Sequence, residues 1–225
     1  GCPVDNLDQL YHQATVLNAV LRARTLAWAS RTGGFLLCRP EAAAGGGGGG
    51  GPARGQPLGV SLGAPASASE NSLDFTHFVR AADLPSGERT ADGPVKWCRL
   101  KDVRRSVEKL ARSYEQDVSK LVDVCRQSIF FERVDDLRAC LALMADEPDV
   151  VLERLKNRLD PNHDASETAG YRSLSLNLRL VSDLTKALGV ETHICEIQLL
   201  MICMAEIKND LGHKRYIAFR NLRGE

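Results

Sequence analysis

Alternation of leucine with polar residues is the most regular pattern in the chain and falls between residues 170 and 180. Successive side chains of a strand point to opposite faces, so this alternation predicts a strand with one core face and one polar face. A second strand is predicted over residues 193–199, where Glu196 and Gln198 share a side. The alternating residues of the first strand are Ser173, Leu174, Ser175, Leu176, Asn177, Leu178, Arg179 and Leu180.

The two predicted strands form one polar surface if they pair. We then expect Glu196 to look across the pair toward Ser173 or Ser175, while Cys195 and Ile197 point into apolar packing. A carboxylate in that setting suits a magnesium ligand or a general base. A solvated sheet face without a function is the alternative, and the pattern leaves both open.

The remaining periodicities predict further helices and strands. Helical spacing occurs near residues 6–30, 95–122 and 134–145 and after residue 199, with a short helical connector between the two strands above, and further strands are expected over residues 123–131 and 150–159. Strands interleaved with helices indicate an α/β or α+β domain. We expect the α+β class, with a mixed sheet of about four to five strands flanked by helices. The first helix is amphipathic, so we expect it to pack on this domain, on a partner domain or on a second copy of the chain.

A glycine run separates the first helix from the rest of the chain. Residues 45–51 are consecutive glycines, and proline, alanine and serine are frequent up to residue 72. Such a composition does not repay its ordering entropy, so we expect a flexible, mostly disordered linker over residues 33–94. An N-terminal helix over residues 1–32 would precede it, and a folded domain over residues 95–225 would follow. A phosphate-binding loop is excluded, because the run lacks the flanking strand and helix and the Gly-Lys-Ser/Thr ending.

Composition narrows the class of protein. The chain has 29 basic and 29 acidic side chains, which argues against a protein that coats nucleic acid or a membrane surface. No apolar run is long enough to cross a bilayer, so a soluble protein is expected. The seven cysteines stand singly, which favours reduced thiols in a reducing intracellular compartment such as the cytoplasm. Because the chain begins without methionine, we expect it to be a fragment of a longer protein.

Clusters of basic residues indicate a local site for an anion. Arg154, Lys156 and Arg158 fall on one side of the strand predicted over residues 150–159. Like charges on one strand face repel one another unless an anion lies there. Either a solvated basic face or a phosphate clamp accounts for a second cluster on the helix predicted over residues 95–122. Its members are Arg104, Arg105, Lys109 and Arg112.

Motifs in the second half of the chain resemble the synthetase domain of the RelA/SpoT family. In chain order they are Asp123 before a strand, Arg154-Leu155-Lys156-Asn157, Gly170-Tyr171-Arg172-Ser173, Glu196-Ile197-Gln198 and the segment from Ala205 to Lys214. The resemblance covers residues 95–216 and implies a sheet of the nucleotidyltransferase type. It also implies an enzyme that moves pyrophosphate from ATP to the ribose 3′ oxygen of GDP or GTP, which makes (p)ppGpp, the alarmone of the stringent response.

The same resemblance implies roles for individual residues. Asp123 and Glu196 would be the catalytic acids and would share a Mg²⁺ ion that bridges the ATP phosphates. Tyr171 would stack on guanine, and Gln198 or Asn157 would hydrogen-bond to the nucleotide. The residues expected to neutralise phosphate charge are Arg126, Arg154 and Lys156.

Several positions depart from the family pattern. Ser175 stands where the family usually has histidine, Asn157 where it has aspartate, and Leu200-Met201 where it has Arg-Thr. An alternative function is therefore a catalytically impaired nucleotide-binding module that regulates a larger protein. A scaffold whose helices bind a partner protein is a third alternative. Nucleic acids and membranes are not expected as partners.

Overall fold

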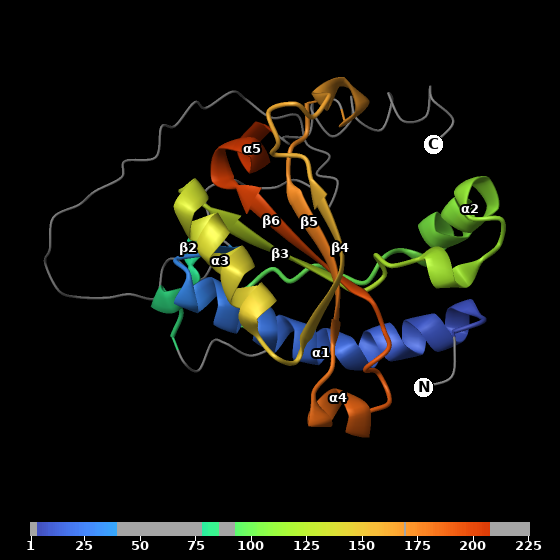
Figure 1. Ribbon diagram of the computed structural model, residues 1–225. Coiled ribbons are helices and arrows are strands. Elements are labelled where there is room, and N and C mark those ends of the chain that lie inside the picture. The colour runs from blue at the N-terminus through green and yellow to red at the C-terminus, as the bar shows by residue number, and fades with distance from the viewer. Residues whose placement is uncertain (1–3, 40–77, 86–92, 169, 208–225) are drawn as a thin grey trace, which may run out of the picture.

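The computed structural model describes residues 4–39, 78–85, 93–168 and 170–207. The strands are β1 (Phe35–Leu37), β2 (Phe78–Arg80), β3 (Arg126–Phe131), β4 (Val150–Asn157), β5 (Leu174–Leu180) and β6 (Cys195–Met201). Within the described ranges they form a six-stranded sheet in the order β2-β1-β3-β6-β5-β4 (Figure 1). β3 and β6 are parallel and the other neighbouring pairs are antiparallel. This arrangement confirms the predicted α+β class with a mixed sheet.

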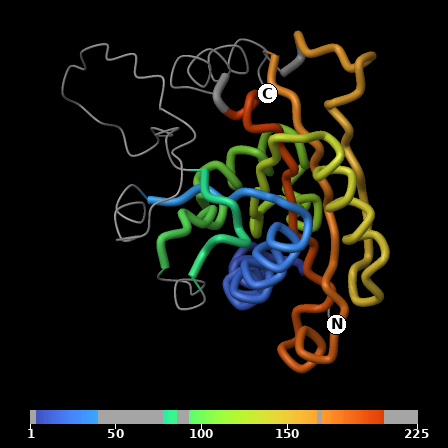
Figure 2. Tube along the Cα trace, turned by 90° about the vertical axis from the view of Figure 1, so that its left-hand side faces the viewer, coloured from blue at the N-terminus to red at the C-terminus, as the bar shows by residue number. Residues whose placement is uncertain are grey.

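Two helices cover one face of this sheet. The helices are α1 (Leu7–Arg31), α2 (Val103–Ser113), α3 (Val134–Asp146), α4 (Asp183–Ala187) and α5 (Ile202–Ile207), with 3₁₀ turns at Ala81–Asp83, Val118–Lys120 and Ala165–Thr168. α1 packs on β3 and α3, and α3 packs on β3, β4 and β6, so both lie against the same face. Figure 1 shows α2 apart from this layer, and Figure 2 shows β4 and β5 side by side at the edge of the sheet. None of the helices in the described ranges has the length and apolar character needed to cross a membrane.

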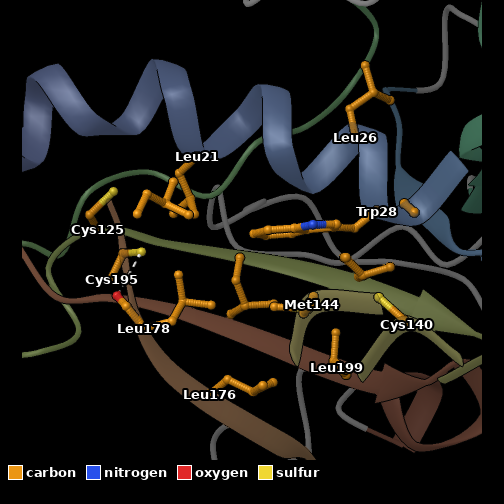
Figure 3. Packing of buried hydrophobic residues seen from close by; sticks show 14 of the residues in the cluster. Leu21, Leu26, Trp28, Cys125, Cys140, Met144, Leu176, Leu178, Cys195 and Leu199 are labelled. Atoms are coloured by element: carbon orange, nitrogen blue, oxygen red, sulfur yellow. Dashed lines mark hydrogen bonds between the residues drawn. The ribbon is translucent and has the colours of Figure 1, made fainter. Parts of the chain in front are cut away.

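The hydrophobic core lies between the two helices and the sheet (Figure 3). Leu176, Leu178 and Ile197 of the sheet are fully buried there, as are Leu21 and Trp28 of α1. The alternation along β5 correctly predicted that its leucines face the core. Burial of one such side chain contributes roughly 1.5–3 kcal/mol, so α1 is an integral part of the fold that also contains the sheet.

Two short strands lie inside the range 33–94, which the sequence predicts to be a linker. Phe35 of β1 pairs with Arg80 of β2 and with Phe130 of β3. The rings of Phe78 and Phe130 pack with their centroids 4.8 Å apart. The linker prediction is wrong for these segments, because strands this short show no period-two pattern and are held by pairing with β3. The glycine run of the same prediction lies outside the described residues.

The helix predicted over residues 95–122 is shorter in the structure. α2 begins after Asp102, whose side chain accepts a hydrogen bond from the Arg105 N–H. It ends before Glu115 and Gln116, whose φ angles of 52° and 66° are left-handed. Such angles terminate a helix, and the spacing of apolar residues does not reveal where they occur.

Candidate functional site

Strand register gathers polar side chains on the face of the sheet away from α1 and α3. Arg126 on β3 lies opposite Glu196 on β6, and Glu196 lies opposite Asn177 on β5. Asn177 in turn lies opposite Arg154 on β4. Paired residues point to the same side of a sheet, so these four residues form one row across four strands. The next row contains Ser128, Gln198, Ser175 and Lys156, and the two rows together are called the polar face.

Glu196 shares this face with Gln198, as their spacing predicts, but its neighbour on β5 is Asn177. The prediction that Glu196 faces Ser173 or Ser175 is wrong, since Ser175 lies opposite Gln198. Register depends on how the strands pack, and the local sequence does not encode it. Glu196 itself is half-buried and lies outside the hydrophobic core.

Glu196 is the one acid of the polar face. Its Oε1 accepts a hydrogen bond from Gln198 Nε2. Burial lowers the pKa of Lys156, and the charges of Arg154 and Arg158 lower it further. The Glu196 carboxylate opposes that shift. Positive charge exceeds negative charge on this side of the sheet, so an anion bound there reduces the repulsion.

A pocket of about 160 Å³ adjoins the polar face and shares Ser128 and Gln198 with it. Tyr171, Trp97 and Phe130 contribute aromatic surface to its wall. Burial raises the pKa of Tyr171 to about 12, and the nearby charge of Glu196 also raises it. Aromatic walls beside hydrogen-bonding side chains suit a planar base.

Asp123 lies outside the polar face, in the segment that precedes β3. Its Oδ2 accepts hydrogen bonds from Lys101 Nζ and, at 3.3 Å, from Lys109 Nζ on α2. Its Oδ1 is buried without a hydrogen-bond partner. Burial alone raises the pKa of Asp123, but the hydrogen bonds and charges of the two lysines hold it below its usual value. Asp123 is thus an ionised carboxylate neutralised by two ammonium groups.

The two carboxylates predicted to hold Mg²⁺ each have other side-chain partners in the structure. Asp123 is paired with two lysines, and Glu196 is hydrogen-bonded to Gln198 in a row that begins with Arg126. In the parts of the chain that the structure describes, no three His, Cys, Asp or Glu side chains are grouped to hold a metal ion. Mg²⁺ needs several oxygen ligands and is repelled by ammonium groups. Asp123, paired with two ammonium groups, therefore does not fit the predicted ion.

The other predicted residues divide between the two sides of β4. Arg154 and Lys156 belong to the polar face. Asn157 lies opposite Leu174, and its Oδ1 accepts a hydrogen bond from the Leu159 N–H at 3.0 Å. Because neighbouring residues of a strand face opposite sides, Asn157 does not join the polar face, and its contact with a nucleotide stays a prediction.

The sequence analysis did not identify the contacts of three residues near the site, namely Lys101, Trp97 and Lys109. Lys101 and Trp97 lie in a non-helical segment far from Asp123 and Tyr171 along the chain, and no local pattern relates them. Lys109 was visible as a member of a basic helix, but its pairing was not. A charge cluster can be recognised from spacing, whereas the carboxylate that it meets depends on the fold.

Comparison with known proteins gives relatives only among solved structures. No family model and no curated protein matches the chain. The small alarmone synthetase 1 from Bacillus subtilis, crystallised with its product pppGpp, is 23% identical, with a TM-score of 0.41 over 52% of this chain and 59% of that chain. A GTP pyrophosphokinase family protein from Streptococcus pneumoniae is 24% identical, with a TM-score of 0.42 over 52% of this chain and 57% of that chain. The chain resembles small alarmone synthetases.

A third solved structure matches a larger share of the chain. It is the complex between the Type VI effector Tas1 and its immunity protein, at 13% identity and a TM-score of 0.46 over 94% of this chain and 74% of that chain. The chain spans about three fifths of the length of the Bacillus subtilis and Streptococcus pneumoniae proteins. The sequence motifs described above resemble the synthetase domain of the RelA/SpoT family, which also makes (p)ppGpp.

Proposed function

We propose that the polar face binds a nucleoside polyphosphate and that the chain acts as a RelA/SpoT-like nucleotide pyrophosphokinase domain. The reaction moves the β,γ-pyrophosphate of ATP to the ribose 3′ oxygen of GDP or GTP. The observation that carries the proposal is the row across four strands, in which Glu196 lies between Arg126 and Arg154. This row supports the proposal because a carboxylate can accept a proton and guanidinium groups can bind phosphate.

The phosphates lie along the cations of the polar face. Arg126, Arg154 and Lys156 supply the positive charge, and Arg158 follows directly after β4. Arg154 is exposed and can reach a ligand from solvent. Guanidinium groups bind phosphate oxygens through paired hydrogen bonds, and a polyphosphate relieves the repulsion among neighbouring cations.

The pocket beside the polar face holds the base. Tyr171 and Trp97 offer aromatic surfaces for stacking. Gln198 belongs to both the pocket and the polar face, so a base in the pocket leaves its phosphates over the cations. The sequence resemblance suggests guanine as the base that stacks on Tyr171.

The chemical step uses the single acid of the polar face. Glu196 accepts the proton of the 3′ hydroxyl, and the oxygen attacks the β phosphorus of ATP. The bond between the α–β bridging oxygen and the β phosphorus breaks, and AMP leaves with that oxygen. Transfer of this kind depends mainly on positioning and charge neutralisation, which Arg154 and Lys156 provide.

Product formation tests this proposal. The folded chain is incubated with ATP and with GDP or GTP, with and without Mg²⁺, and AMP and the 3′-pyrophosphorylated nucleotide are separated by anion-exchange chromatography. The expected result is equal amounts of the two products. A folded protein that releases no AMP with either acceptor, in either condition, rules out the transferase.

A nucleotide-binding module without turnover is the second candidate. The pairing of Asp123 with Lys101 and Lys109 favours it, because one of the two expected catalytic acids is then already neutralised. Calorimetry with guanine and adenine nucleotides separates the candidates. Binding without AMP release supports the regulatory module, and absence of binding rules out both.

We also propose that the protein works in the cytoplasm. ATP and GTP are abundant in that compartment, as both candidate functions require. Four of the six described cysteines are buried and all six are free thiols, which suits a reducing environment. Fractionation of cells that express the tagged chain at its natural level tests this location.

A further inference from the structure

Two lysines form ion pairs with the carboxylate of Asp123, which the sequence predicts to bind a metal ion. Lys101 Nζ and Lys109 Nζ both contact Asp123 Oδ2. The side chain of Lys101 is 10% exposed, that of Asp123 15% and that of Lys109 33%. Lys101 is therefore a fixed part of the interior, whereas Lys109 on α2 borders the solvent.

A divalent cation cannot readily replace Lys101. Moving the lysine away leaves a buried charge without its partner, which is strongly unfavourable. An ion at Asp123 Oδ2 would also be repelled by both ammonium groups at contact distance. The other oxygen, Oδ1, is enclosed by protein and offers no approach.

Lys109 connects this cluster with the polar face. Its Nζ lies 4.9 Å from the centre of the Tyr114 ring. Asn177 of the polar face donates a hydrogen bond at 3.1 Å to the carbonyl of Val122, the residue before Asp123, so the two groups adjoin. After burial and the charges of two arginines, the charge of Lys109 also contributes to the lowered pKa of Lys156. An ammonium group has three donors, so contacts with Asp123 and Tyr114 leave one for a phosphate oxygen. Lys109 thus adds a cation next to those that β4 contributes.

We propose that the ammonium groups of Lys101 and Lys109 replace the divalent cation, so that the polar face binds nucleoside polyphosphates free of Mg²⁺. This inference rests on the proposed function, because it concerns the ligand of the same face. A Mg²⁺ ion held by the nucleotide's own phosphates cancels two of their negative charges. A face of fixed cations therefore binds the free nucleotide at least as tightly as its Mg²⁺ complex.

Binding of fluorescent GDP and ATP analogues to the full chain tests the inference. Titrations are run in excess EDTA and in saturating MgCl₂ at equal ionic strength. The dissociation constant in EDTA is expected to equal, or lie below, the value in MgCl₂. A value more than about threefold higher in EDTA overturns the inference and leaves the proposed function standing. Absence of binding in both buffers overturns the proposed function, and the inference with it.

A lysine variant tests the residue that borders the solvent. Lys109→Met is expected to weaken binding in EDTA by about tenfold or more, as for a lost charge-assisted hydrogen bond. Lys109→Arg keeps the charge and is expected to retain the affinity within about threefold. Lys186→Met on α4, with a side chain 57% exposed, removes the same charge far from the polar face and is the matched control. If Lys109→Met binds as tightly as Lys186→Met, Lys109 does not replace the cation and the inference falls.

Discussion

The two faces of the sheet are made from the same strands and differ in chemistry. On β5, Leu176 and Leu178 are fully buried against the helix layer, while Asn177 between them belongs to the polar face. On β6, Ile197 is likewise buried against the helix layer, while its neighbour Glu196 belongs to the polar face. The helices α1 and α3 close one face and exclude charge, whereas the other face gathers cations around a single acid. Substitutions on the first face should therefore change stability, and substitutions on the second should change binding and turnover.

The largest effect is expected from Leu176→Ala on the apolar face. Leu176 is fully buried, so the truncation should lower the free energy of unfolding by about 2–5 kcal/mol. Urea denaturation followed by circular dichroism measures the loss. Ser175→Ala changes the neighbouring residue on the other face and should cost less than about 1 kcal/mol. Similar losses of unfolding free energy in both variants would contradict the claim that only the apolar face determines stability.

A pH dependence is expected from His193, which is 2% exposed and whose Nδ1 lies 3.4 Å from Gln13 Oε1 of α1. Burial lowers the pKa of His193 from 6.5 to about 4. The unfolded chain takes up this proton near pH 6.5 and the folded chain only near pH 4, so the stability is fully present above pH 6.5. It is lost as the pH falls through this window, by on the order of 3 kcal/mol.

Urea denaturation at a series of pH values measures this contribution. His193→Gln should flatten the dependence between pH 4 and pH 6.5. His12→Gln, on the exposed side of α1, should leave the dependence unchanged. Equal slopes for the wild type and His193→Gln would show that this imidazole does not make the α1 layer sensitive to protonation.

On the polar face, Glu196→Gln should lower turnover and spare stability. The amide keeps the shape of the side chain but cannot accept the proton, so AMP release should fall by roughly 100-fold or more. The free energy of unfolding should stay within about 1 kcal/mol of the wild type. Glu132→Gln, with a side chain 59% exposed, is the matched control and should keep full turnover. If the Glu196→Gln protein does not fold, Glu196 has a structural role and the proposed catalytic role is contradicted.

Gln127 links the two faces and should show a smaller, mixed effect. Its Nε2 donates to Asn18 Oδ1 of α1 at 3.0 Å and to the Cys98 carbonyl at 3.3 Å, and its Oε1 accepts from the Cys98 N–H at 3.1 Å. Gln127→Leu leaves these groups unpaired and should cost about 1–3 kcal/mol of stability. Because Cys98 lines the pocket, nucleotide affinity should also fall. Ser128→Ala is the control for stability, and a stable Gln127→Leu protein with normal affinity would refute the link.

Some features of the site follow from the sequence alone. The alternation over residues 173–180 indicated which side of β5 faces the core, and the spacing of Glu196 and Gln198 placed both on one side of β6. The same reasoning placed Arg154 and Lys156 together on β4. These inferences hold because a strand alternates its side chains whatever it pairs with. The assignment of Asn157 came from the family motif and stays a prediction, although the same alternation puts Asn157 on the other side of β4 from Arg154 and Lys156.

Only the tertiary structure decided which of these residues meet. The register that sets Glu196 between Arg126 and Asn177 joins β6 both to β5, the preceding strand, and to β3, which lies far away in the chain. Packing of the sheet against α1 and α3 selects this register. The pairing of Asp123 with Lys101 and the addition of β1 to β3 depend on the same long-range packing. Local periodicity records which side of an element is buried. It carries no information about the partner across the sheet, because that choice is made by the free energy of the whole packed core.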